Sequence, residues 1–268
     1  MNMNALLIID PQNDFCNPGD KTGHGKGALY VPNADQDMIR LSWFINANIN
    51  KIDHIVVTLD FHHYNDISHP NFWTDKSGKH PEPFTKITFQ DVIEEKWLPS
   101  FEPQKVKEYL QKLENQNKYA HIIWPEHCLI GSDGAAIFKP VLESINNWSK
   151  NDNYFQPIFK GMYPFSEHFG AFASQVVYDD VEETKINYQL LDELGSFETI
   201  YLAGEAKSHC VASTLEQLIN FAPTLVSRLV ILEDAMSDVV GFENAANSIY
   251  EQAKKLGAKF QKTEDLIN

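Results

Sequence analysis

A cysteine in the last third of the chain lies where a nucleophile could be activated. Cys210 follows the apolar run 198–203, which is typical of a strand, and precedes an amphipathic stretch that is typical of a helix. At a strand-to-helix turn, the free amides and positive dipole of the helix favour thiolate over thiol, and the same amides can hold an oxyanion. Free cysteine is more often a small buried hydrophobe, so Cys210 alone leaves both interpretations open.

Two more strand-like runs end in ionisable residues. The apolar run Ala5–Ile9 ends at Asp10, and the run 156–159 ends at Lys160, which Gly161 follows. Ligands of open α/β sheets bind at the carboxyl ends of the strands, where these side chains would emerge. A strand-terminal aspartate can instead cap a turn, and a lone lysine is commonly solvated.

The three residues together indicate one kind of chemistry more specifically than any one of them does alone. Asp10, Lys160 and Cys210 supply a base, a cation and a nucleophile, which hydrolysis of an amide through a thioester requires. The sequence therefore predicts a cysteine hydrolase, provided that the three strand ends meet.

Apolar runs alternate with helical patterns along the chain, which predicts a three-layer α/β/α fold with a central, mostly parallel six-stranded sheet. The strand-like runs are 5–9, 55–59, 120–123, 154–159, 199–203 and 229–232, and the helical patterns are 35–48, 136–148, 186–194, 211–221 and 243–256. The length of 268 residues and the absence of a linker rich in Ser, Gly or Pro predict a single domain over residues 1–268.

Composition argues against several classes of protein. The net charge of −15 would repel a polyanion, so we expect no nucleic-acid partner. The sequence contains no signal-like N-terminus and no apolar run of about 20 residues, so we expect a cytoplasmic protein without a membrane partner. The three cysteines, an odd number, do not form a disulfide framework and agree with a reducing compartment.

At this point the chain resembles the isochorismatase-like cysteine hydrolases, and among them the nicotinamidases. The family contexts "IIDxQNDF", "KG" and "GxAxxxCV" occur here in the family's order, and the resemblance runs from Asn4 to about Thr263. It implies that Asp10 takes the thiol proton, Lys160 lowers the cysteine pKa and Cys210 attacks. It further implies a cis peptide between Glu205 and Ala206, and an oxyanion hole formed by the amides of Ala206 and Cys210.

The resemblance also implies a divalent metal, zinc first, with iron or manganese as alternatives. The family's Asp-x-His pair and its "WPxHC" turn correspond to Asp60, His62 and His127, and His69 is a candidate extra ligand. Carboxylate and imidazole suit these metals, although a His-rich stretch is otherwise typical of a surface. In the family, the metal binds the pyridine nitrogen of nicotinamide.

Two aromatic residues match the walls that sandwich the flat ring in nicotinamidases. These are Phe15 and Trp124, for which packing in the core is the alternative explanation. The family's members are often oligomers, so the resemblance is compatible with a homo-oligomer, although the sequence does not fix the oligomeric state.

The chain departs from compact nicotinamidases in three places. An insertion at about 70–120, with a helix-like run from Pro103 to Lys118, could form a lid, a dimer contact or an altered substrate wall. Glu205 replaces a small or apolar residue, and we expect it to face outward or to pair with Lys207. The run from Met162 to His168 also differs from the family's small residues.

The sequence thus predicts a nicotinamidase-like amidohydrolase that converts nicotinamide and water to nicotinate and ammonia through a thioester on Cys210. Its partner would be a small-molecule amide. One alternative is a family hydrolase acting on another small amide, carbamoyl or ureido substrate. Another is a catalytically silent binding module that uses the insertion as its contact surface.

Overall fold

A six-stranded parallel sheet forms the centre of the computed structural model, which describes residues 3–116 and 120–267. Its strand order is β5-β2-β1-β6-β7-β8, and each neighbouring pair is parallel. The strands are β1 (Asn4–Ile9), β2 (His54–Asp60), β5 (Gln156–Lys160), β6 (Thr199–Gly204), β7 (Leu229–Leu232) and β8 (Lys259–Gln261). The predicted parallel sheet is confirmed.

Strand β1 shows why the inner strands have continuous apolar sequences. Ala5, Leu7 and Ile9 face one hydrophobic cluster, whereas Leu6 and Ile8 face a second cluster on the other side of the sheet. All five side chains are fully buried. A strand covered on both faces has no solvent-facing side, so its sequence does not alternate with polar residues.

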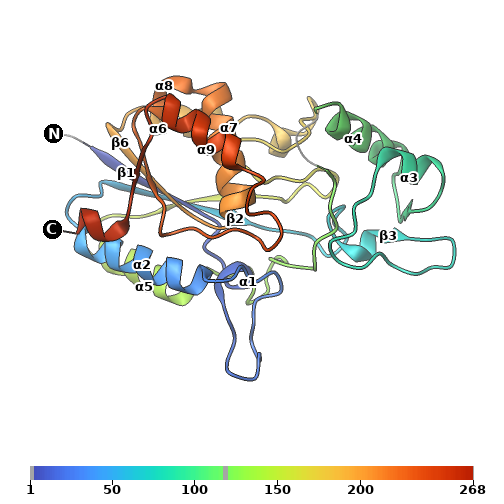
Figure 1. The fold of residues 1–268 in the computed structure, drawn as a ribbon, viewed down its shortest axis with the longest axis horizontal. Coiled ribbons are helices and arrows are strands. Elements are labelled where there is room, and N and C mark those ends of the chain that lie inside the picture. Colours follow the sequence, from blue (N-terminus) through green and yellow to red (C-terminus); the bar gives the residue numbers. More distant parts are fainter. Residues whose placement is uncertain (1–2, 117–119, 268) are drawn as a thin grey trace.

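Helices cover both faces of the sheet, as the three-layer prediction requires (Figure 1). One layer contains α2 (Ala34–Ala47) and α5 (Lys139–Ser149). The opposite layer contains α6 (Tyr188–Leu194), α7 (Ala212–Phe221), α8 (Pro223–Val226) and α9 (Asn247–Lys255). The short helix α1 (Asn13–Cys16) directly follows the turn after β1.

One predicted strand is wrong, and one strand is missing from the prediction. The run 120–123 makes only an isolated bridge between Ile122 and Lys86, and Ile123 packs into a separate hydrophobic cluster. The sixth strand is instead β8, whose residues Lys259, Phe260 and Gln261 are partly or fully exposed. A three-residue edge strand has no apolar run by which its sequence could be recognised.

The described part of the segment 70–120, which the sequence analysis predicts to be an insertion, forms a small layer of its own at one end of the molecule (Figure 1). It contains η1 (Pro70–Phe72), β3 (Trp73–Thr74), α3 (Phe89–Ile93), β4 (Leu98–Pro99) and α4 (Pro103–Asn115). Two short 3₁₀ turns lie outside this segment, η2 (Glu182–Thr184) and η4 (Thr263–Leu266). In α4, Val106, Tyr109, Leu110 and Leu113 are buried at helical spacing, which explains why this run is a helix. The end of the predicted run at position 118 lies outside the described residues.

The parallel arrangement brings the ends of four strands together. Asp60 is in register with Lys160, and Ile9 is in register with Gly204. A Cβ at Gly204 would lie 2.0 Å from the Ile9 carbonyl oxygen, and one at Gly161 would lie 2.6 Å from an Asp60 carboxylate oxygen. Glycine at both positions therefore permits the close approach that this edge requires.

Among the described residues, none of the helices is both long enough and apolar enough to cross a membrane.

Candidate active site

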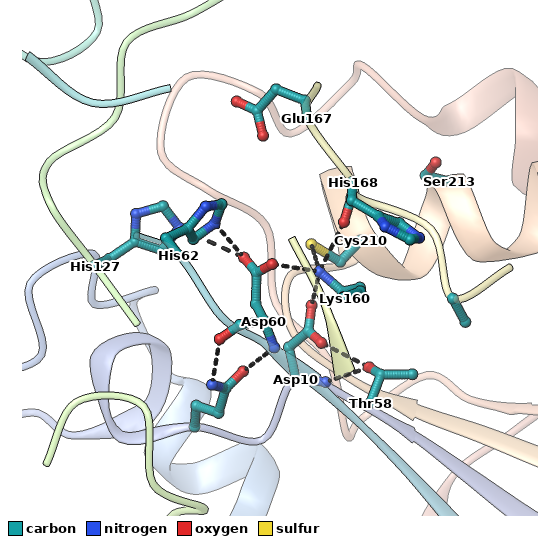
Figure 2. A network of polar contacts seen from close by, with 12 residues as sticks. Asp10, Thr58, Asp60, His62, His127, Lys160, Glu167, His168, Cys210 and Ser213 are labelled. Atoms are coloured by element: carbon teal, nitrogen blue, oxygen red, sulfur yellow. Dashed lines mark hydrogen bonds and ion pairs between the residues drawn. The ribbon is translucent and has the colours of Figure 1, made fainter. Parts of the chain in front are cut away.

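Lys160 lies at the centre of a buried polar network at the carboxyl edge of the sheet. Its Nζ is 2.9 Å from Asp10 Oδ2, 3.0 Å from Asp60 Oδ1 and 3.8 Å from Cys210 Sγ (Figure 2). It also donates to the His168 carbonyl at 2.9 Å. Burial alone would lower the pKa of Lys160, but Asp10 and Asp60 raise it well above its ordinary value, so the side chain remains an ammonium.

One carboxylate oxygen of Asp10 accepts a hydrogen bond, and the other faces the ammonium of Lys160. Oδ1 accepts the Thr58 hydroxyl at 2.6 Å, while Oδ2 faces Lys160. The residue is fully buried, and its backbone has a left-handed φ of 43°. Burial raises the pKa of Asp10, against the opposing effect of Lys160, which moves this carboxyl towards the role of a proton acceptor.

Cys210 is the third member, and the structure places it beside the other two. It lies in the π-helical turn η3 (Lys207–Val211), which connects β6 to α7. Burial raises the pKa of the Cys210 thiol well above its ordinary value, and Lys160 offsets this only in part. Desolvation thus opposes the preference of the turn for thiolate, and the thiol loses its proton to a base, for which the adjacent Asp10 carboxylate is available.

The peptide bond between Glu205 and Ala206 is cis, as the resemblance implied. Ala206 and Cys210 both line a cavity at the sheet edge. The cavity is therefore bordered by the two residues whose amides the resemblance assigns to the oxyanion hole.

The expectation for the Glu205 side chain is wrong. Its carboxyl neither faces outward nor pairs with Lys207, but is fully buried and accepts the Ser237 amide at 3.1 Å. Lys207 instead pairs with Asp238 at 3.6 Å.

The three predicted metal ligands come together beside the triad. Asp60, His62 and His127 offer ligand atoms that all lie within 4.8 Å of one another, and all three residues are buried. The Nδ1 atom of His127 lies 2.8 Å from the Pro125 carbonyl, which leaves its Nε2 on the side of Asp60, 3.6 Å from Oδ2. One carboxylate and two imidazoles fit zinc, iron or manganese.

His69 lies against this cluster without belonging to the set of three. Its ring centroid is 5.0 Å from that of His62 and 5.4 Å from that of His127. Both of its ring nitrogens are buried, and neither has a hydrogen-bond partner among the described residues. Burial, with the neighbouring His62 and His127, lowers the pKa of His69 to about 3, so the ring is neutral.

Residues that the sequence analysis did not single out hold these groups in place. The Gln12 side chain donates to the Asp60 carbonyl and accepts the Asp60 amide, both at 2.7 Å. Asp14 accepts the Cys128 amide at 2.6 Å and thereby fixes the turn that carries His127. Asp66 lies 3.2 Å from His62 Nδ1. Gln12 and Asp14 belong to the "QND" motif, which was the available signal, whereas Asp66 had none.

The predicted aromatic walls do line the cavity. Phe15 and Trp124 both contact it, together with Leu29, Phe169, His209 and Val239. Glu167, from the run that departs from the family, also lines it and accepts the Trp124 indole at 3.1 Å. Burial raises the pKa of Glu167 to about 8. Because it lies in an irregular loop, no sequence pattern pointed to it.

Comparisons with known proteins agree with this geometry at the level of the fold. No protein-family model matches the sequence, and no curated protein matches it. Among solved structures, an Acinetobacter baumanii nicotinamidase/pyrazinamidase matches with a TM-score of 0.62 and 20% identity, over 99% of each chain. The yeast nicotinamidase bound to the inhibitor nicotinaldehyde matches with a TM-score of 0.64 and 19% identity, over 97% of this chain and 100% of that one.

A Pyrococcus horikoshii pyrazinamidase in complex with zinc also matches, with a TM-score of 0.55 and 18% identity, over 97% of this chain and 98% of that one. The likeness extends over nearly the whole of each chain. The chain therefore has the isochorismatase-like hydrolase fold, which it shares with these nicotinamidases and pyrazinamidases.

Proposed function

We propose that the chain is a cysteine amidohydrolase of the nicotinamidase type, in which a small aromatic amide is hydrolysed through a thioester on Cys210. The observation that carries this proposal is the position of the Lys160 ammonium, 2.9 Å from Asp10 and 3.8 Å from Cys210 Sγ, beside a cavity with aromatic walls. A base, a cation and a thiol in contact form the set that thioester chemistry needs.

The first half of the reaction forms the thioester. Asp10 takes the Sγ proton as the sulfur attacks the carboxamide carbon, and the amides of Ala206 and Cys210 stabilise the resulting oxyanion. Asp10 then returns the proton to the amide nitrogen, the C–N bond breaks and ammonia leaves. The ammonium of Lys160 stays protonated throughout and limits the negative charge of the buried carboxylates.

The second half of the reaction hydrolyses the thioester and regenerates the thiol of Cys210. Asp10 takes a proton from water, the resulting hydroxide attacks the thioester carbon, and the C–S bond breaks. Asp10 returns the proton to the sulfur, and the product leaves as a carboxylic acid that loses its proton to solvent.

A divalent metal would be held by Asp60, His62 and His127, with His69 as a further candidate ligand. When bound, it would supply a Lewis-acidic position for a ring nitrogen of the substrate. The zinc complex of the Pyrococcus horikoshii protein supports zinc as the first candidate.

The lining of the cavity supports a flat substrate. Phe15, Trp124 and Phe169 line it, and aromatic faces pack well against a planar ring. The names of the structural neighbours support nicotinamide as the first substrate to assay, with pyrazinamide second.

Ammonia release from a panel of amides tests the proposal. The panel contains nicotinamide, pyrazinamide, benzamide, a carbamoyl compound and a ureido compound, assayed with the wild type, Cys210→Ala and Cys16→Ala. Cys16 is a buried free cysteine outside the cavity lining, so it serves as the matched control. We expect turnover of nicotinamide by the wild type and by Cys16→Ala, and none by folded Cys210→Ala.

The other results discriminate the alternatives. Turnover of only the carbamoyl or ureido compound would keep the chemistry and change the substrate. Absence of ammonia from every amide, together with no reaction of Cys210 with a thiol-directed probe, would favour a binding module. Full activity in Cys210→Ala would refute the thioester.

A further inference from the structure

A buried carboxyl directly precedes Ala206, one of the residues that line the cavity. Glu205 is fully buried, and its Oε2 accepts the Ser237 amide at 3.1 Å. No donor among the described residues reaches its Oε1. A buried carboxylate oxygen without a donor is costly, and a neutral carboxyl avoids most of that cost.

A second carboxyl, from α2, meets Glu205 at the same serine. The Ser237 amide donates to Glu205 Oε2, and the Ser237 hydroxyl donates to Asp37 at 2.5 Å. Two buried carboxylates that lie so close repel each other, which favours a proton on one of them. Arg40 pairs with Asp37, whereas no cation among the described residues pairs with Glu205, so the proton belongs on Glu205. Burial and Asp37 together raise the pKa of Glu205 well above its ordinary value, in agreement with this assignment.

Other ionisable groups around Glu205 do not provide a counter-charge. On the side of α1 lies the Cys16 thiol, which is buried and has a raised pKa. Asp238 adds negative charge from the segment after β7, and its own partner is Lys207 at 3.6 Å. Ionisation of Glu205 would therefore add a charge to a region that already contains Asp37 and Asp238.

The backbone around Glu205 is tied to two other parts of the structure. The Glu205 amide donates to the carbonyl of Ile9 at 2.8 Å, and Ile9 is the residue before Asp10. The Lys207 amide donates to the Ser237 carbonyl at 2.8 Å. Ser237 links the Glu205 side chain to Asp37 of α2, so this turn, the segment around Ser237 and α2 form one connected unit.

We propose that Glu205 is a positioning residue: its neutral carboxyl, bonded to the Ser237 amide, fixes the turn that carries Ala206 at the edge of the cavity. This inference rests on the proposed function, because it assigns the Ala206 amide to the oxyanion. Glu205 does not touch the reacting atoms and acts through Ala206.

The inference predicts a particular dependence on pH. The folded chain keeps a proton on Glu205 at pH values where the unfolded chain has lost it. Stability therefore falls as the pH rises from about 4.5 towards the raised pKa, by up to about tenfold per pH unit in the unfolding equilibrium constant. Glu205→Gln keeps a neutral group with one donor and one acceptor, and so lacks this loss.

The test compares the wild type, Glu205→Gln and the control Glu233→Gln, which removes an exposed carboxyl. Urea unfolding and kcat for nicotinamide are measured from pH 5 to pH 9. We expect Glu205→Gln to gain stability relative to the wild type as the pH rises, and to keep kcat at alkaline pH where the wild type loses it. The control should follow the wild type in both measurements. Parallel unfolding profiles in all three proteins would overturn the inference.

Glu205→Leu provides a second measurement, because it removes the acceptor for the Ser237 amide at similar volume. We expect kcat to fall about tenfold with KM little changed, since an oxyanion donor acts on the transition state. Glu205→Gln should restore kcat. Wild-type kcat in Glu205→Leu would refute the positioning role. If no amide is hydrolysed by the wild type, the proposed function fails and this role falls with it, whereas the unfolding profiles still decide whether Glu205 is neutral.

Discussion

The carboxylate of Asp10 differs in role from that of Asp60, although both contact Lys160. Asp10→Asn removes the base but keeps the size of the side chain, and Asn tolerates the left-handed φ of 43° at this position. The ammonium still pairs with Asp60, so the variant should fold. We expect kcat to fall by about 10²- to 10⁴-fold, which is the usual contribution of a positioned base. Ammonia release and a thermal melt check this, and a kcat within threefold of the wild type would contradict it.

Thr58 offers a way to change the pKa of this base without removing it. Its hydroxyl donates to Asp10 Oδ1 at 2.6 Å, and this hydrogen bond lowers the pKa of Asp10 against the raising effect of burial. Asp10 must be ionised to accept the thiol proton, so kcat/KM should fall as the pH drops through its pKa. Thr58→Val should move this acid limb to higher pH. A pH–rate profile that is unchanged on the acid side would show that another group controls it.

Strand ends were predictable from the sequence, whereas side chains in irregular segments were not. Asp10 and Lys160 each follow an apolar run, and parallel strands bring such residues to one edge. Glu167 and Asp66 lie in irregular segments whose course depends on tertiary packing, so their positions in the site had no local signature. The apolar run 120–123 was mistaken for a strand because burial in the insertion's cluster produces the same pattern as burial in a sheet.

The metal cluster connects two elements that the sheet does not join. Asp60 ends β2, whereas His127 comes from the turn that Asp14 holds through the Cys128 amide. His127→Ala should therefore lower both the metal content per chain and the gain in stability on adding zinc. For the wild type, that gain is about 2.7 kcal/mol at a zinc concentration 100 times the Kd.

Elemental analysis and thermal melts with and without a chelator measure these effects. His63→Ala is the matched control, because His63 is an exposed neighbour of His62. Asp66→Asn should weaken metal binding by about 10- to 100-fold, since Asp66 lies 3.2 Å from His62 Nδ1 and can orient the ring. Equal metal content in all four proteins would show that the ion, if any, is held elsewhere.

On the scale of the whole molecule, the buried apolar residues fall into three clusters. Two lie on opposite faces of the sheet, and the third belongs to the insertion and to segments packed on it, including Phe165 and Val176. Ile123 of the third cluster directly precedes Trp124, which lines the cavity. The insertion is thus connected to the wall of the cavity through its own core.

Leu110 tests whether this third cluster opens independently of the sheet. It is fully buried on α4, so Leu110→Ala should cost about 2–5 kcal/mol, whereas Gln111→Ala, at the next and exposed position of the same helix, should cost little. Because the cluster has its own core, the loss should appear as faster hydrogen exchange in α3 and α4 with β1 and β6 unchanged. Since Trp124 adjoins the cluster, KM should rise more than kcat falls. Equal acceleration of exchange in α4 and β1, measured by mass spectrometry, would instead show that the insertion and the sheet unfold as one cooperative unit.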